Sequence, residues 1–101
     1  MIAKILRSRL RETDFVARYG GEEFVTLLTG ADTQAALQVA EAMRTAVEGG
    51  GLHANGRPVT ITLSGGLSVF AAGDSPEDVF ERADRAMYQA KRQGKNAVVR
   101  G

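Results

Sequence analysis

The adjacent glycines Gly20 and Gly21 constrain the fold of this chain more than any other feature of its sequence. They lie between two apolar runs, residues 15–19 and 24–28, and each run has the length and composition of a β-strand. Gly-Gly is a standard signal for a tight turn between antiparallel strands. The sequence therefore predicts a β-hairpin with strands at about 15–19 and 23–28.

Two carboxylates follow the turn directly, at Glu22 and Glu23. Like charges repel, and consecutive side chains of a strand point to opposite faces, so packing alone does not favour this pair. A binding site for a divalent cation beside a phosphate would favour two carboxylates after a glycine turn. Glycine lets a ligand approach the backbone, and carboxylate oxygens suit Mg²⁺. The structural alternative is a solvated hairpin tip, and the turn by itself leaves both interpretations open.

Helical periodicity and capping residues predict three helices. An apolar stripe predicts one over residues 2–11, and Asp32 or Thr33 can cap a second at about 33–48. Ser75 followed by Pro76 and two acids predicts the start of a third helix, which Gly94 ends. The core face expected for the second helix comprises Ala36, Val39, Ala40, Met43 and Val47.

Alternation of apolar and polar residues predicts a strand over residues 59–69, bent or bulged at Gly65-Gly66. Residues 52–58 before it have the composition of a loop, with a possible tight turn at Asn55-Gly56. A short closing strand is expected at 97–99.

The composition excludes several classes of protein. The chain has 101 residues, enough for one small domain, and its net charge of +1 gives no reason to expect nucleic-acid binding. It has no cysteine, which excludes disulfides and thiolate metal sites. No apolar run reaches the roughly 18 residues that span a membrane, and no signal peptide is evident. We therefore expect a cytoplasmic location.

A longer series of motifs extends the hairpin signal. Arg11-Glu-Thr-Asp14 is followed after five residues by Gly-Gly-Glu-Glu-Phe24, and later by Leu-Ser-Gly-Gly-Leu-Ser68, Ala83-Asp84, Tyr-Gln-Ala-Lys91 and Gly-Lys-Asn96. In order and spacing this resembles the GGDEF family of diguanylate cyclases, in the variant with glutamate at the third position. The resemblance covers nearly the whole chain. It implies an α+β, ferredoxin-like nucleotide-cyclase fold, with residues 1–101 as a single partial GGDEF domain that lacks the family's first strand and following helix.

The resemblance also implies a reaction, in which two GTP molecules condense to cyclic di-GMP within a homodimer that uses Mg²⁺ or Mn²⁺. Catalytic positions would be Gly20, Gly21, Glu22 and Glu23. Glu22 matches a metal ligand, whereas Glu23 matches a second carboxylate that acts either as ligand or as base. Because the family's first strand carries a metal-binding aspartate, we expect this chain alone to be inactive. A cyclic di-GMP-binding module without turnover and an inactive fragment remain as alternatives.

Four more residues match binding positions of the family. Lys91 and Lys95 match cations that hold the terminal phosphates, although cations there would also complement a helix dipole. Arg11 and Asp14 match an RxxD site at which product inhibits the enzyme. The alternative for that pair is an exposed ion pair of little energetic value. Family members often add a second arginine, whose position here is taken by Ala42 with Arg44 nearby.

The missing first strand would leave a gap in the middle of the predicted sheet. Either the hairpin and the strand at 59–70 close up and pair in parallel, or two chains supply strands to one another. We favour the second possibility, a dimer.

Overall fold

The chain folds into three helices and six short strands within residues 2–11, 14–20, 23–28, 32–50, 53–59 and 61–101, which the computed structural model describes. Of residues 2–3, 15–20, 23 and 53–54 only the backbone is considered. In chain order the elements are α1 (Ile2–Arg7), β1 (Phe15–Gly20), β2 (Glu23–Leu27), α2 (Thr33–Glu48), β3 (His53–Ala54), β4 (Arg57–Pro58), β5 (Ser64–Leu67), α3 (Pro76–Arg92) and β6 (Ala97–Arg100).

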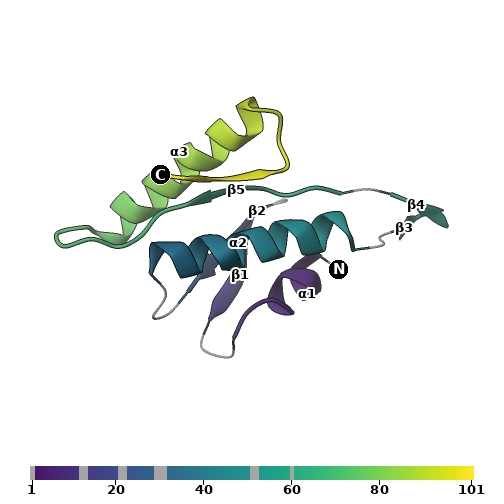
Figure 1. Cartoon of the computed structure of the whole chain (residues 1–101), viewed down its shortest axis with the longest axis horizontal. Helices are drawn as coiled ribbons and strands as arrows, with labels where there is room; N and C mark the ends of the chain where they lie inside the picture. The colour runs from purple at the N-terminus through teal and green to yellow at the C-terminus, as the bar shows by residue number, and fades with distance from the viewer. Residues whose placement is uncertain (1, 12–13, 21–22, 29–31, 51–52, 60) are drawn as a thin grey trace.

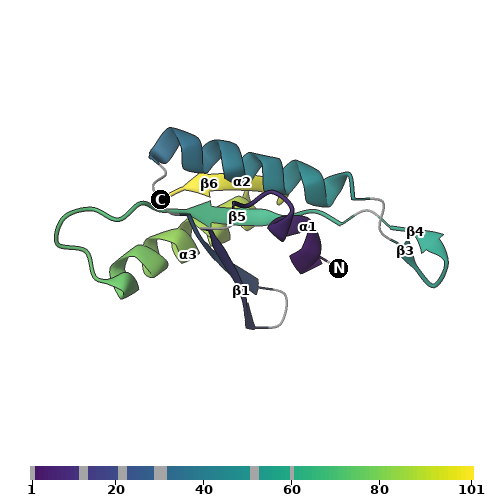
Figure 2. The same cartoon turned by 90° about the horizontal axis from the view of Figure 1, so that it is seen from below.

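The strands form three separate pairs. β1 with β2 and β3 with β4 are antiparallel, whereas β5 and β6 are parallel, because α3 carries the chain back between them. Figures 1 and 2 show α2 and α3 on opposite faces of the β5–β6 pair. This pair is therefore the middle layer of the molecule, and α1 contacts both α2 and β1.

Both long helices begin where the sequence predicts. The carboxylate of Asp32 accepts a hydrogen bond from the Ala35 amide (2.8 Å) and caps α2. Ser75 and Asp78 form a reciprocal capping box at the start of α3, with distances of 3.2 and 2.9 Å, and Pro76 occupies the first helical position. No helix in the described part of the chain combines the length and apolar composition that crossing a membrane requires.

The main core lies between α1 and α2. Leu6 and Val47 are each 1% exposed and Met43 is 7% exposed. Apolar residues from α1 and the segment after it, β2, α2 and the segment before β5 pack around them, namely Ile5, Leu10, Phe24, Val39, Ile61 and Leu63. The predicted inner face of α2 is confirmed at Ala36, Met43 and Val47, while Val39 and Ala40 are only partly buried. One core thus joins the hairpin to the rest of the fold.

The predicted bend or bulge at Gly65-Gly66 is wrong. Both glycines lie in regular parallel pairing with β6, Gly65 opposite Val98 and Gly66 opposite Val99. Their small size serves packing instead. A Cβ atom on Gly66 would overlap the Ala83 carbonyl oxygen and the Met87 amide nitrogen of α3. The strand therefore contacts the helix backbone to backbone, which no residue with a side chain would allow.

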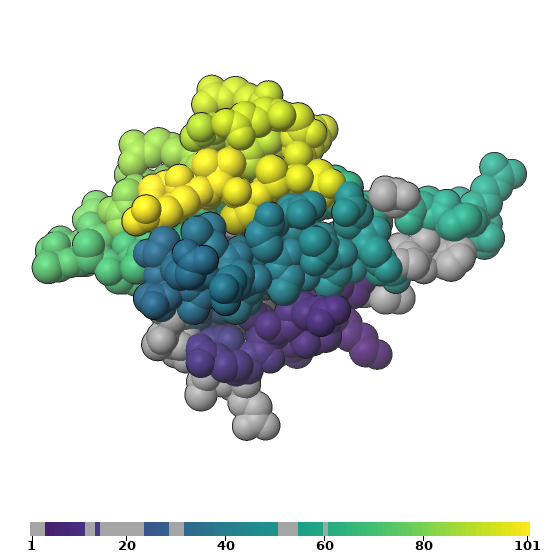
Figure 3. Space-filling view, viewed as in Figure 1, coloured from purple at the N-terminus to yellow at the C-terminus, as the bar shows by residue number. Residues whose placement is uncertain are grey.

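Three predicted boundaries also need correction. The strand expected at 59–69 pairs only over Ser64–Leu67. The first helix ends at Arg7 rather than at residue 11. The Arg9 and Leu10 amides donate to carbonyls only three residues earlier, those of Leu6 and Arg7 (3.1 Å each), and the Ser8 hydroxyl donates to the Ile5 carbonyl (2.6 Å). Within the expected loop at 52–58, β3 and β4 form a small hairpin with positive φ at Asn55 and Gly56. Figure 3 shows this hairpin projecting from the body.

The closed sheet, the less favoured of the two predicted alternatives, does not occur among the described residues. Each strand of the β1–β2 hairpin pairs only with the other, and β5 pairs with β6. Parallel pairing of the hairpin with the later strand is therefore wrong. The dimer, which was the preferred alternative, stays a prediction.

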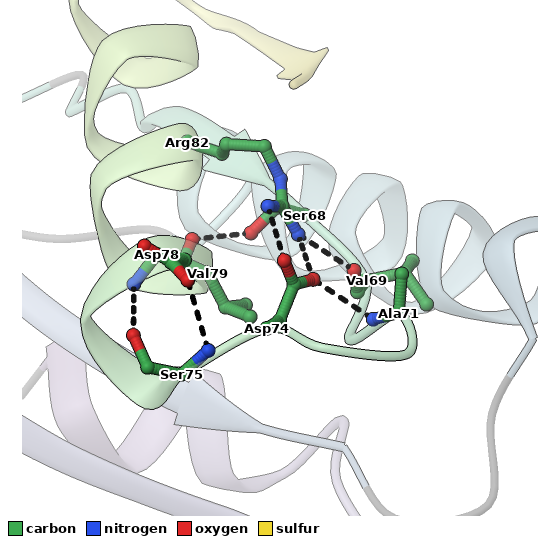
Figure 4. Close-up of polar contacts among 8 residues, drawn as sticks. All are labelled: Ser68, Val69, Ala71, Asp74, Ser75, Asp78, Val79 and Arg82. Atoms are coloured by element: carbon green, nitrogen blue, oxygen red, sulfur yellow. Dashed lines mark hydrogen bonds and ion pairs between the residues drawn. The ribbon is translucent and has the colours of Figure 1, made fainter.

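An ionic network fastens the segment after β5 to α3 (Figure 4). The Arg82 guanidinium donates to both carboxylate oxygens of Asp74 (3.0 and 2.7 Å) and to the Val69 carbonyl (3.0 Å). The Ala71 amide donates to the same carboxylate (2.9 Å). The bond from Arg82, followed by that from Ala71, lowers the pKa of Asp74 below its usual range. The Ser68 hydroxyl adds a bond to the Val79 carbonyl (2.5 Å).

We expect Gly66→Ala to lower the free energy of unfolding by about 3 kcal/mol or more, which is at or above the upper end of the usual cost of overpacking a core. The reason is that the added methyl group would overlap backbone atoms of α3. Gly65→Ala is the matched control. Its Cβ would lie 3.4 Å from a Val98 methyl group, an ordinary contact, and should change the free energy of unfolding by less than about 1 kcal/mol. Urea unfolding of both variants measures the difference. Equal stability of the two would contradict the close contact.

Asp74 should make stability depend on acid pH. Its pKa is lowered in the folded state, so its contribution is fully present above the unfolded value of about 3.9 and is lost as pH falls through the folded value. Asp74→Asn should therefore be less stable than the parent at pH 6, and the two should converge below about pH 4. Urea unfolding from pH 3 to 6 tests this.

Arg82→Gln should remove the same acid-dependent part of the stability, and the double variant should lose less than the sum of the single losses. A constant difference between parent and Asp74→Asn across the pH range would show that the carboxylate charge is not stabilising.

Candidate functional site

The predicted hairpin at the centre of the site is confirmed. β1 and β2 pair in antiparallel register from Phe15 opposite Leu27 to Gly20 opposite Glu23, with one register shift between Arg18 and Gly20. Gly21 and Glu22, which separate the two strands in the sequence, lie outside the described residues. The direct pairing of Gly20 with Glu23 brings the flanks of the predicted site together.

Packing of β2 positions the backbone of Glu23. Phe24, the next residue, is partly buried against the cluster of Leu6, Met43 and Val47. The core thus anchors β2 at the residue that follows Glu23.

The donor atoms of the hairpin suit a hard divalent cation, since two carboxylates offer oxygen ligands of the kind that Mg²⁺ and Mn²⁺ prefer. Within the described residues, no group of three or more His, Cys, Asp or Glu side chains could hold a metal ion. Glu22, the predicted ligand, lies outside them, and only the backbone of Glu23 is described. The metal site therefore stays a prediction from donor chemistry.

Arg11 and Asp14, the second predicted pair, lie in direct contact. Two nitrogens of the Arg11 guanidinium donate to the two carboxylate oxygens of Asp14, Nε to Oδ2 (3.3 Å) and Nη2 to Oδ1 (3.2 Å). The Arg11 main-chain amide donates to Oδ2 as well (3.0 Å). The Arg11 side chain is 62% exposed, whereas that of Asp14 is 2% exposed. A buried carboxylate thus orients an arginine that faces solvent.

The structure also describes Arg44, which lies near Ala42, the position at which family members often have a second arginine. Arg44 on α2 donates to Glu41 (2.5 Å) and to the side-chain oxygen of Asn96 (3.0 Å), and the bond to Glu41 raises the pKa of Arg44. Asn96 in turn donates to Glu48 (2.6 Å). Arg44 therefore ties α2 to the turn before β6. This link was not expected from the sequence, although Asn96 belongs to one of the recognised motifs.

Lys91 and Lys95, the predicted phosphate ligands, flank the end of α3. Both are exposed, and the Lys91 ammonium lies 5.5 Å from the ring centroid of Tyr88. The Lys95 amide closes the helix by donating to the Ala90 carbonyl (3.0 Å). Gly94, Lys95 and Asn96 all have positive φ, at 115°, 66° and 48°. Such a backbone is costly for lysine, and strain of this kind is often retained where a residue has a function.

Comparison with known proteins identifies the family. The family model described as "Diguanylate cyclase, GGDEF domain" matches residues 1–97. The diguanylate cyclase DgcP of Pseudomonas aeruginosa is 47% identical over 98 residues, which are 97% of this chain and 15% of that protein. This chain thus spans a small part of that relative.

Comparison with solved structures identifies the same family. The chain resembles the diguanylate cyclase SiaD of P. aeruginosa, solved with its activator SiaC, with a TM-score of 0.93 and 34% identity over 99% of this chain and 38% of that one. It also resembles the GGDEF domain of DgcB from Caulobacter crescentus, solved with c-di-GMP, with a TM-score of 0.91 and 31% identity over 98% of this chain and 60% of that one.

These similarities confirm the predicted α+β nucleotide-cyclase fold. The motif series that begins at Arg11 and ends at Asn96 lies within the part of the chain that the family model matches. On this evidence the chain belongs to the GGDEF-domain family of diguanylate cyclases.

Proposed function

We propose that this domain takes part in the condensation of two GTP molecules into cyclic di-GMP. The observation that carries the proposal is the Gly-Gly-Glu-Glu-Phe string at a hairpin whose flanking residues, Gly20 and Glu23, pair directly. An identity of 47% to a diguanylate cyclase over nearly the whole chain supports it. In this reaction the 3′-hydroxyl oxygen of each GTP attacks the α-phosphorus of the other, so that two phosphodiester bonds form. At each α-phosphorus the bond to the oxygen that bridges to the β-phosphate breaks, and one pyrophosphate leaves. Each hydroxyl proton passes to a base.

The hairpin residues would have separate roles at the reacting phosphates. Gly20 and Gly21 have no side chains that would obstruct the ribose and phosphates. Glu22 would hold Mg²⁺ or Mn²⁺, and that ion when bound offsets the negative charge that gathers on the phosphates. Glu23 supplies a second carboxylate, which either shares the ion or accepts the proton of the 3′-hydroxyl.

Lys91 and Lys95 would bind the terminal phosphates of GTP. Lys91 lies in the last turn of α3 and Lys95 in the turn that reverses the chain into β6, and both ammonium groups are carried on flexible stems. The helix dipole explains a preference for Lys91 in the last turn but not the left-handed backbone of Lys95. One GTP would be presented by each subunit of a homodimer.

Arg11 and Asp14 would bind the product. The guanidinium fork suits a guanine edge or a phosphate, and the carboxylate can accept hydrogen bonds from guanine N–H groups. Their existing contact supports joint action, because a ligand would meet an arginine that is already oriented. If the domain binds cyclic di-GMP without turnover, this pair alone would account for its function. That is the second candidate function.

In the complete domain, Glu22→Gln should reduce synthesis of cyclic di-GMP from GTP and Mg²⁺ by about a hundredfold or more, because it removes a charged ligand from the metal site. Chromatography of the nucleotides formed by the purified complete domain measures the loss. Glu81→Gln, which alters an exposed carboxylate of α3, is the control and should leave synthesis within about twofold of the parent. Retained synthesis in Glu22→Gln would exclude the proposed role of this glutamate. Absence of synthesis by the complete domain without any substitution would favour the binding module.

Arg11→Ala should weaken binding of cyclic di-GMP by about tenfold or more, as expected for loss of a charge-assisted contact. Isothermal calorimetry of the parent and the variant gives the ratio. Arg9→Ala is the matched control, since Arg9 is an exposed arginine two residues away. Equal weakening by both substitutions would indicate a general charge effect rather than a site at Arg11.

A further inference from the structure

A groove of about 520 Å³ lies between α3 and the end of β6, lined by residues that the proposed reaction does not use. Figure 1 shows the C-terminal end of the chain beside the middle of α3. The lining includes Arg85, Gln89 and Arg92, which recur at helical spacing along α3, together with Tyr88. Ala86 and Gly101 line it where the helix and the end of β6 meet.

The groove carries positive charge that the fold does not neutralise. Arg82 also lines it, but its charge is paired with Asp74. In the part of the chain that the structure describes, neither Arg85 nor Arg92 forms an ion pair or a side-chain hydrogen bond, and both are exposed. No carboxylate side chain lines the groove. The exposed guanidinium groups of the groove therefore favour a ligand that carries negative charge.

The kinds of residue present favour a protein as that ligand. Arginine and tyrosine are enriched at the centres of protein interfaces, and Tyr88 is 53% exposed at the edge of this groove. A small-molecule site would instead be lined mainly by apolar side chains with few polar groups. Three arginines and a glutamine do not meet that description.

We propose that this groove docks an acidic helical segment of a partner protein. Arg85 and Arg92 are seven residues apart, which places them about 10.5 Å apart along the helix axis. Carboxylates seven residues apart on one face of a partner helix have the same separation. The position between them would lie opposite Gln89, whose amide can donate to a further carboxylate.

The test uses two fluorescently labelled, alanine-based helical peptides of equal charge. In the first, two glutamates are seven residues apart and share one face. In the second they are five residues apart and point to different sides. We expect the first peptide to bind about tenfold more tightly by anisotropy, as two weak ion pairs allow, and to lose affinity as salt is raised.

Arg85→Ala combined with Arg92→Ala should weaken binding of the first peptide by about tenfold, whereas Arg57→Ala, at an exposed arginine of β4, should leave it within about twofold. Thermal unfolding of each variant controls for loss of structure. Equal binding of both peptides, no binding of the first, or an unchanged affinity in the double variant would overturn the proposal. Displacement of the peptide by micromolar inorganic pyrophosphate would overturn it in favour of a phosphate site.

Discussion

The contact of β5 with α3 at Gly66 is the constraint on which the arrangement of the C-terminal half depends. Because a Cβ atom has no room there, the strand lies against the helix backbone and fixes how closely α3 sits on the β5–β6 pair. At that separation the Ser68 hydroxyl reaches the Val79 carbonyl, and Arg82 reaches both Asp74 and the Val69 carbonyl. At the far end of the same pair, the Gly101 amide donates to the Leu67 carbonyl (2.6 Å).

α2 links this half to the hairpin. One face buries Met43 and Val47 in the core against which Phe24 of β2 packs. Another part of the helix holds Arg44 and Glu48, both of which bond to Asn96 in the turn after α3. α2 therefore contributes to the core that anchors β2 and also bonds directly to the turn after α3.

The charges of α3 follow the helix dipole, with acids in its first turn and bases in its last. That pattern would stabilise the helix with or without a ligand. Two features are not explained by the dipole, namely the left-handed backbone of Lys95 and the Arg85 side chain, which lies away from the last turn and forms no ion pair among the described residues. They lie in different settings, a turn and a groove, and we assign them to different ligands.

Local signals in the sequence determined the β1–β2 hairpin, the bounds of α2 and the start of α3. The Gly-Gly turn, the Asp32 cap and the Ser75 capping box each act within a few residues, so the hairpin, α2 and the start of α3 could be predicted. The order of motifs also determined the family and the residues proposed for its chemistry.

Long-range contacts decided the rest, because they join residues that have no local relation. The pattern of alternation could not show that β5 pairs only over four residues, or that Gly65-Gly66 serves contact with a helix rather than a bulge. The bonds from Asn96 to Glu48 and from Arg82 to Asp74 likewise depend on how the helices pack. The sequence by itself thus determined the local structure and the chemical groups, whereas tertiary packing decided which of those groups meet.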